Sequence, residues 1–345
     1  MKTTFLTCCT LVAIVLAGMV APQVAAQDNG DSVSGDERAG TAAAEYLLIP
    51  LSARTAALGS TLTGGLSNLS AVEALQANPA AMMVGTGTSA QFSRMEYVAD
   101  IGVNAIGVAQ RFGSNSIALT VSAWDYGEIP ETTVDSPDIT NVTYDAGSTV
   151  VGLSLARQFT DRIAAGFTVK ALSESIDDMT GSAAAFDAGM TYVVGESGLR
   201  FGVSLKNFGT KMSFGGSGLT TTGSGGTPVN IDVLESELPS LLNFGASYTR
   251  QFEGDLSVTA LANFRSLAYD QDEYALGLEA GYANLFYVRG GFQMSQEMDA
   301  TFYEGWNAGA GLNLSLSGVD LSVDYAYRGT QYFSGVNLFT VGLSL

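Results

Sequence analysis

The stretch GVDLSVDYAYRG, residues 318–329, decides which fold the chain is expected to adopt. Along it, apolar and polar side chains alternate: Val319, Leu321, Val323, Tyr325 and Tyr327 with Asp320, Ser322, Asp324 and Arg328. Because successive side chains of a β-strand point to opposite faces, this pattern predicts a strand with one apolar and one polar surface. Two surroundings suit such a strand: a protein core opposite water, or lipid opposite a wet lumen.

Strand length favours lipid. From Thr88 onward, we predict fourteen strands, mostly ten to thirteen residues long, at 88–98, 101–112, 115–125, 147–159, 162–173, 183–195, 198–208, 241–252, 255–266, 273–283, 286–294, 305–315, 318–328 and 335–345. Strands of soluble sheets typically have about five or six residues, whereas a tilted strand that crosses a bilayer needs about nine to eleven. The last predicted strand alternates up to Leu345, as the terminal strand of a membrane barrel does.

The predicted connections are alternately short and long. Residues 160–161 and 317–318 form tight turns, whereas 126–146 and 209–240 are long loops. Outer-membrane barrels have short periplasmic turns and longer outer loops, and only a closed sheet satisfies every backbone group in lipid. We therefore predict an all-β membrane protein: a 14-stranded antiparallel outer-membrane β-barrel, in contact with lipid, with both termini periplasmic. The alternative is a secreted soluble β-protein.

The N-terminal residues predict export. Lys2, the apolar run 11–21 and a small-residue cleavage site after Ala26 are typical of a signal peptide, assigned to residues 1–26. Residues 27–44 are polar, acidic and without periodicity, which predicts a flexible linker. Both cysteines, Cys8 and Cys9, lie in the predicted signal peptide, so the mature chain is expected to have none.

Composition disfavours several functions. The chain has no histidine, the commonest general base and metal ligand. Neither a phosphate-binding loop nor a serine-nucleophile motif is present, so we expect no enzyme, no cofactor and no dedicated metal site. The net charge of −19 disfavours nucleic acid, whose phosphates require a basic surface.

Residues 45–87 differ from the rest because they predict short helices and turns. Ser70 and Glu73 form a capping-box pattern, and Asn78-Pro79 ends the helix that follows. The block is apolar but too short to be expected to fold alone. Its helix is rich in alanine, and therefore slim enough to lie against a lumen of small side chains. We predict an N-terminal hatch inside the barrel.

The segments YLLIPLSARTAALGSTLTGG (46–65) and NPAAMM (78–83) resemble the start of the PorV/PorQ family. The matching hatch-motif residues are Leu48, Ile49, Ala53, Arg54, Gly59, Asn78 and Pro79. The resemblance implies a FadL-like fourteen-strand barrel with a hatch. It also implies a role in the type IX secretion system, with a translocon, attachment-complex proteins and cargo C-terminal domains as partners.

Arg54 is the candidate lock of the hatch. A guanidinium enclosed in a lumen needs a carboxylate partner. Four carboxylates lie on predicted inward faces: Asp187, Glu279, Asp320 and Asp324. The alternative is an exposed periplasmic arginine.

The long connection 209–240 is a candidate docking loop. Its apolar residues stand among acidic ones: Ile231, Val233, Leu234 and Leu238. An exposed apolar patch there would fit a protein partner. The alternative is a segment that folds back over the barrel mouth.

Two functions follow from these patterns. The first is the secretion role that the resemblance implies, and the second is a FadL-like channel for hydrophobic small molecules. The sequence favours the first, because the predicted inward faces are mainly small, polar or charged and lack an apolar stripe wide enough for an acyl chain.

Overall fold

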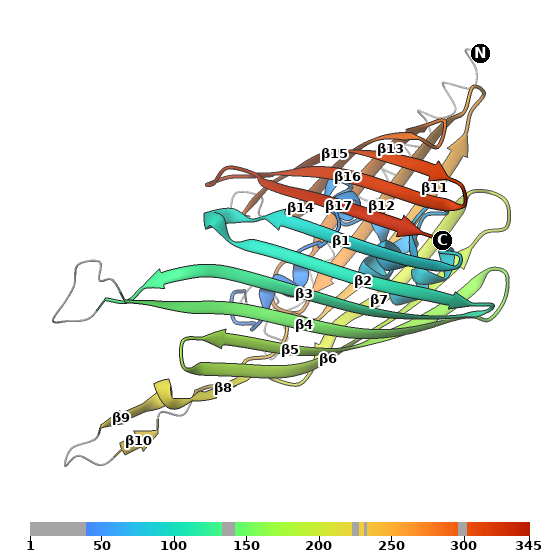
Figure 1. Ribbon diagram of the computed structural model, residues 1–345. Helices are drawn as coiled ribbons and strands as arrows, with labels where there is room; N and C mark the ends of the chain where they lie inside the picture. The colour runs from blue at the N-terminus through green and yellow to red at the C-terminus, as the bar shows by residue number, and fades with distance from the viewer. Residues whose placement is uncertain (1–38, 133–141, 223–227, 231–232, 296–301) are drawn as a thin grey trace, which may run out of the picture. The chain divides into compact units, whose positions relative to one another are not determined.

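A closed antiparallel sheet forms most of the computed structural model, which describes residues 39–132, 142–222, 228–230, 233–295 and 302–345. The predicted signal peptide and linker residues 27–38 lie outside the described residues. In the described chain, fourteen strands form the wall (Figure 1): β1 (Thr88–Glu96), β2 (Gly102–Phe112), β3 (Asn115–Pro130), β4 (Thr143–Gln158), β5 (Ile163–Ile176), β6 (Met179–Val193), β7 (Leu199–Gly209), β11 (Leu241–Gln251), β12 (Leu256–Leu267), β13 (Glu273–Tyr282), β14 (Phe286–Ser295), β15 (Tyr303–Leu316), β16 (Val319–Thr330) and β17 (Val336–Ser344).

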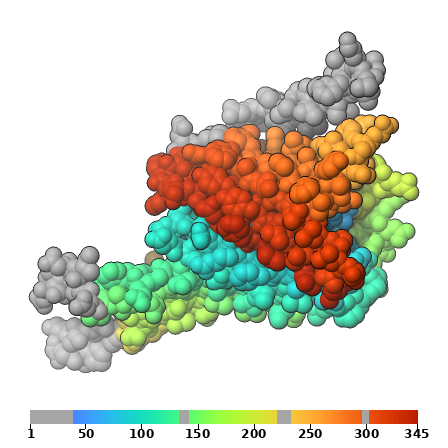
Figure 2. Space-filling view, turned by 45° about the horizontal axis from the view of Figure 1, so that its top comes forward, coloured from blue at the N-terminus to red at the C-terminus, as the bar shows by residue number. Residues whose placement is uncertain are grey.

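Strand pairing closes the wall into a barrel. Each strand pairs with its neighbours in the sequence, β7 pairs with β11, and β1 pairs with β17. Figure 2 shows this last seam from outside, where the red C-terminal strands lie against the cyan N-terminal ones. At its end, the Leu345 amide donates to the Thr88 carbonyl oxygen at 2.8 Å. The predicted fold class, a 14-stranded antiparallel barrel, is confirmed.

Three wall strands run further than their sequence patterns predict. β3 continues to Pro130, β4 begins at Thr143 and β6 begins at Met179, so both ends of the predicted loop 126–146 belong to strands. Beyond the lipid, the two faces of a strand meet the same solvent, and the alternation that marks its ends disappears. The predicted loop 209–240 also contains short strands: β8 (Ser213–Gly216), β9 (Thr220–Thr222) and β10 (Pro228–Asn230).

Burial in the wall is reversed relative to a soluble sheet. In the opening stretch, Val323 and Tyr325 are 43% and 37% exposed, whereas Asp324 and Arg328 are 4% and 5% exposed. The same reversal holds around the wall, with exposed apolar residues such as Phe92, Leu119, Leu153, Phe167, Leu278 and Val288, and buried polar ones such as Gln91, Ser154, Thr168, Asn243, Glu279 and Arg289. An exposed apolar belt of this extent fits hydrocarbon outside the barrel.

Residues 45–84 lie within the barrel as short helices: η2 (Glu45–Leu48), α2 (Ala53–Ala57), η3 (Leu62–Gly64), α3 (Ala71–Ala77) and η4 (Pro79–Val84). Two further short helices, η5 (Val98–Asp100) and η6 (Ser217–Leu219), lie in connections between strands. None of the helices in the described ranges is long and apolar enough to cross a membrane.

The hatch runs from one rim of the barrel to the other. At the rim with the longer loops, the Ala43 amide donates to the Glu237 carbonyl oxygen at 2.9 Å. At the rim with the short turns, Arg111 donates to the carbonyl oxygens of Met83 and Gly85. The C-terminal residue, Leu345, lies at the short-turn rim, whereas the first described residue, Ala39, lines a cavity at the long-loop rim.

The exposed apolar belt generates a stability prediction. Val323→Arg places a charge on the outer face near the middle of β16, and we expect it to lower the free energy of unfolding from lipid vesicles by about 2–4 kcal/mol. The matched control is Glu253→Arg in the exposed turn after β11, where we expect a loss of about 0–1 kcal/mol. Denaturant titration of the vesicle-folded protein measures both. Equal losses for the two variants would contradict a lipid-facing β16.

Candidate functional site

The hatch has its own caps and its own apolar core. Ser70 Oγ accepts from the Glu73 amide at the start of α3, as the capping box predicts, and Asn78 Oδ1 accepts from the Ala80 amide at the start of η4. Leu58, Leu62 and Leu66 are at most 1% exposed. Apolar packing of this kind closes the middle of the lumen.

Glycines of the wall form the seat of the hatch. At eight of them, a Cβ atom would lie closer than 3.0 Å to hatch atoms: Gly107, Gly166, Gly189, Gly202, Gly245, Gly277, Gly291 and Gly309. They come from eight different strands. The wall therefore approaches the hatch backbone at distances that no other residue permits, which accounts for part of the high glycine content.

Arg54 lies in a buried cluster of charges. It makes a bidentate ion pair with Glu279, Nε to Oε2 at 2.8 Å and Nη2 to Oε1 at 2.7 Å. Arg289 donates to the same carboxylate at 2.6 Å and also to Asp324. Glu73 on α3 lies 3.7 Å from Arg54, and burial raises the pKa of this carboxyl group. Three carboxylates thus share two guanidinium groups, and the cluster joins the hatch to β13, β14 and β16.

Two of the four predicted partners of Arg54 belong to this cluster, and two do not. Glu279 is a direct partner, and Asp324 is connected to it through Arg289. Asp187 is not a partner, because it pairs with Lys170 at 2.7 Å on the β5–β6 side of the wall. Asp320 is not one either, because it lies exposed near the short-turn rim, where it accepts from Ser315. Alternation shows which side chains point inward, but not where each lies around or along the barrel. Asp187 lies on another side of the wall, and Asp320 lies nearer the short-turn rim.

The remaining hatch-motif residues have mainly structural contacts. Asn78 donates to the carbonyl oxygens of Thr63, Met190 and Val203, and Pro79 lies against Gly166. The Ala53 amide donates to Thr340 Oγ1 at 2.9 Å. Gly59 has a φ of +65°, which favours glycine. Leu48 and Ile49 differ from these, because both line cavities.

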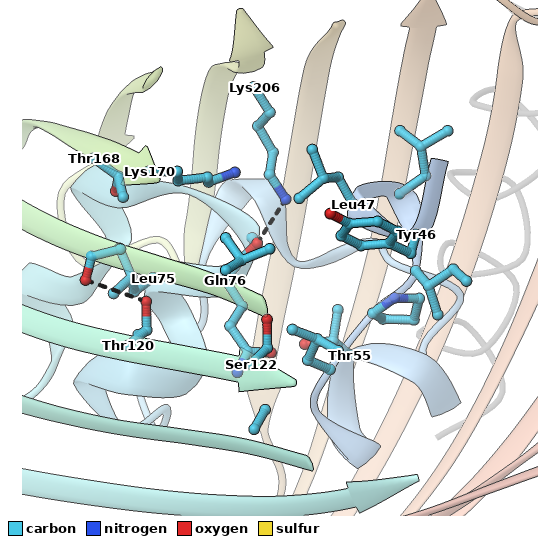
Figure 3. A pocket seen from close by; sticks show the side chains of 18 of the residues that line it. Tyr46, Leu47, Thr55, Leu75, Gln76, Thr120, Ser122, Thr168, Lys170 and Lys206 are labelled. Carbon is cyan, nitrogen blue, oxygen red and sulfur yellow. Dashed lines mark hydrogen bonds between the residues drawn. The ribbon is translucent and has the colours of Figure 1, made fainter. Parts of the chain in front are cut away.

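An inner pocket of about 140 Å³ lies between the hatch and the wall (Figure 3). Leu75 and Gln76 border it from α3, and Lys170 and Lys206 border it from β5 and β7. Lys206 Nζ donates to the Gln76 carbonyl oxygen at 2.8 Å, near the end of α3. Three cationic side chains and no carboxylate line this pocket: Lys170, Lys206 and Arg265.

A larger cavity of about 930 Å³ lies at the long-loop rim; we call it the outer cavity. Six aromatic side chains line it, from the hatch, the wall strands and the connections between them: Tyr46, Tyr97, Trp124, Tyr126, Phe302 and Tyr303. The ring centroids of Tyr46 and Tyr97 lie 5.5 Å and 5.8 Å from that of Trp124. Residues Tyr46, Leu48 and Ile49 line both spaces, so this part of the hatch separates the outer cavity from the inner pocket.

The candidate docking loop does not form one exposed patch. Ile231 lies outside the described residues, while Val233 and Leu234 are exposed, Leu234 by 90%. Leu238 is buried beside Met212 and Leu172, so its inclusion in the patch was wrong. The end of this connection folds back over the barrel mouth, because an apolar residue there can pack against the inner wall.

No protein-family model matches the chain, and no curated protein matches its sequence. Solved structures do match its fold. The toluene transporter TbuX of Ralstonia pickettii has a TM-score of 0.54 at 14% identity, over 85% of this chain and 97% of the other. The CymD monoaromatic hydrocarbon channel gives 0.54 at 12%, over 86% and 97%, and a FadL homologue of Pseudomonas aeruginosa gives 0.52 at 11%, over 85% and 97%. The chain has the fold of these barrels.

Sequence reasoning missed several residues of the site. Tyr46 belongs to the matched segment, but no pattern showed that its ring faces a cavity. The predicted strand 88–98 includes Tyr97, but β1 ends at Glu96, and Phe302 lies in a connection without periodicity. Arg289 could have been found from the sequence, because it alternates with the apolar Val288 on β14. It therefore points inward, beside Glu279 on the neighbouring strand. Among the described residues, no group of three acidic side chains is placed to hold a metal ion.

The Arg54 cluster generates a prediction about the hatch. Arg54→Met leaves Glu279 and Glu73 without their shared partner, and breaking a buried ion pair in this way costs about 3–5 kcal/mol. We expect faster cleavage of residues 45–87 by an added protease. Lys211→Met is the control, because its pair with Glu237 is half exposed and exposed pairs contribute little. Equal cleavage rates for Arg54→Met and the parent protein would contradict a role of Arg54 in holding the hatch.

The glycine seat generates a second prediction. Gly291→Ala directs a methyl group at the backbone of Leu58 and Gly59, whereas Gly290→Ala, one residue away, meets no atom closer than 3.9 Å. Overpacking costs about 1–3 kcal/mol, so we expect only Gly291→Ala to lower the thermal unfolding temperature and expose the hatch to protease. Similar behaviour of the two variants would contradict a tightly seated hatch.

Proposed function

We propose that the chain is an outer-membrane channel that admits small hydrophobic molecules through the outer cavity. The observation that carries this proposal is a space of about 930 Å³ walled by six aromatic side chains at the long-loop rim. Ligand sites are typically concave and largely apolar, with a few polar groups. Structures of similar fold that are named as a toluene transporter and a monoaromatic hydrocarbon channel support the same role.

The inward faces of the strands alone disfavour uptake. Those faces are indeed mostly small or polar, but the outer cavity takes Tyr46 from the hatch and Tyr97 and Phe302 from connections. The cavity therefore has an aromatic surface that could contact an apolar ligand, without an apolar stripe on the wall. Passage beyond it requires the hatch to rearrange, because the lumen below is closed by buried leucines.

The secretion role implied by the PorV/PorQ resemblance is the second candidate. In it, the barrel receives cargo C-terminal domains from a translocon and passes them to an attachment complex. The hatch motif and the exposed Leu234 favour it, because an exposed apolar residue on an outer connection suits a protein partner. Deletion of the gene distinguishes secretion from uptake. If the chain acts in secretion, cargo with the sorting domain no longer reaches the cell surface, and normal delivery of that cargo would contradict the role.

The uptake role predicts a measurable flux. Cells that lack other hydrocarbon channels should take up radiolabelled toluene several-fold faster when they express this chain. Ile49→Trp adds bulk where the outer cavity meets the inner pocket, and we expect it to abolish most of the increase. Val323→Trp, on the outer face, is the control and should leave uptake unchanged. Uptake at the background rate, with the barrel folded in the membrane, would contradict the role.

A further inference from the structure

The outer cavity carries an excess of negative charge. Four carboxylates and two guanidinium groups line it: Glu45, Glu174, Asp270 and Glu273, with Arg265 and Arg328. The inner pocket has the opposite lining, with three cationic groups and no carboxylate. Two of those three cations are paired with carboxylates, Lys170 with Asp187 and Arg265 with Glu273, so the acidic excess of the outer cavity is the clearer feature.

Both guanidinium groups of the outer cavity already have partners. Arg265 pairs with Glu273 at 2.6 Å. Arg328 donates to Asn307 Oδ1 at 3.0 Å and Gln293 Oε1 at 2.9 Å, and its guanidinium lies 3.8 Å from the centroid of the Tyr303 ring. Arg265 is therefore neutralised by Glu273, whereas Arg328 has only neutral partners and keeps its charge, so the lining retains an excess of two negative charges.

Three carboxylates of the cavity are left without a cation. No Lys or Arg nitrogen of the described chain lies within 4.0 Å of Glu45, Glu174 or Asp270. Glu45 lies near Asp270, and burial together with this neighbouring charge raises the pKa of its carboxyl group. The Oε1 atom of Glu174 is buried, and its neighbouring hydrogen-bond donor is the Tyr46 hydroxyl rather than a cation. Glu174 is half-buried, whereas Glu45 and Asp270 are exposed, so a bound cation would offset partial desolvation at Glu174 and the repulsion between Glu45 and Asp270.

Aromatic faces stand beside these carboxylates. Tyr46 and Tyr97 pack against Trp124, and Phe302 contacts both Tyr97 and Tyr303. The Tyr46 hydroxyl lies beside the Glu174 carboxylate, and burial, together with this neighbouring charge, raises its pKa above the usual range. Aromatic rings attract cations through their negative faces, as the placement of Arg328 over Tyr303 already shows in this wall.

From this combination we propose that the outer cavity binds organic cations, in which an ammonium group is attached to an apolar body. The apolar body would contact the rings, and the ammonium group would lie beside Glu174, Glu45 and Asp270. A neutral hydrocarbon gains only the ring contacts, whereas an anion is repelled by the carboxylates. The buried leucines of the hatch would hold the ligand in the outer cavity while the hatch is closed. The inference deepens the proposed uptake function and depends on it for passage, but not for binding.

The two tryptophans of the chain allow a direct binding measurement. Trp124 lines the outer cavity, whereas Trp306 is 43% exposed on the outer face. Trp306→Phe leaves Trp124 as the sole reporter. The purified full chain in detergent is titrated with phenyltrimethylammonium, with its neutral isostere tert-butylbenzene, and with benzenesulfonate. We expect the cation to quench Trp124 with a Kd about tenfold lower than that of the neutral isostere, and benzenesulfonate not to bind.

Charge-removing variants assign the site. In the same background, Glu174→Gln keeps the shape of the side chain, and we expect it to weaken binding of the cation several-fold while the neutral isostere is unaffected. Glu45→Gln, on the hatch, should act in the same direction and serves if the strand variant does not fold. Glu253→Gln, in an exposed turn at the opposite rim, is the matched control and should change nothing.

Each outcome decides the inference. Equal affinity for the cation and the neutral isostere, binding of none of the probes, or cation binding that survives both Glu174→Gln and Glu45→Gln would overturn it. Toluene uptake that persists in such a case would leave the proposed function standing. Preferential binding of the cation without any toluene uptake would support the inference and remove uptake of neutral hydrocarbons instead.

Discussion

A backbone amide or carbonyl group that meets hydrocarbon without a partner costs several kcal/mol, and this cost governs the structure. The β1–β17 pairing leaves no open edge in the fourteen-strand wall. Once the wall is closed and its apolar faces meet lipid, the alternate side chains have to point into a lumen, and that lumen has to be either wet or filled. Alternation along β16 therefore determines both what the barrel contacts outside and what it can enclose.

Here the lumen is filled by forty residues of the same chain. Those residues bring Arg54 and Glu73 to Glu279 and Arg289, where each charge is buried among opposite charges. They also fit between glycines that allow the wall to approach the hatch backbone. Close packing and paired charges together hold the hatch in one arrangement, and a transport route has to loosen both.

Much of the wall could be predicted from the sequence, because lipid imposes a period of two and a minimum length on each strand. All fourteen strands are where the pattern places them. The predictions failed where lipid no longer selects residues: the ends of β3 and β4 past the rim, and the fold of residues 209–240. They also failed to separate the true partners of Arg54 from Asp187 and Asp320, and to locate the cavities. The position of those carboxylates in the barrel, and the side to which Tyr46, Tyr97 or Phe302 turns, depend on tertiary packing.

Lipid outside the barrel and a solvent-accessible cavity inside it are the two surroundings that shape this chain, and its two tryptophans report on them. Quenching by lipids brominated along their acyl chains, measured on single-tryptophan variants in vesicles, tests this most directly. We expect strong quenching of Trp306 in the Trp124→Phe variant and little quenching of Trp124 in the Trp306→Phe variant. Equal quenching of the two, or stronger quenching of Trp124, would contradict the account.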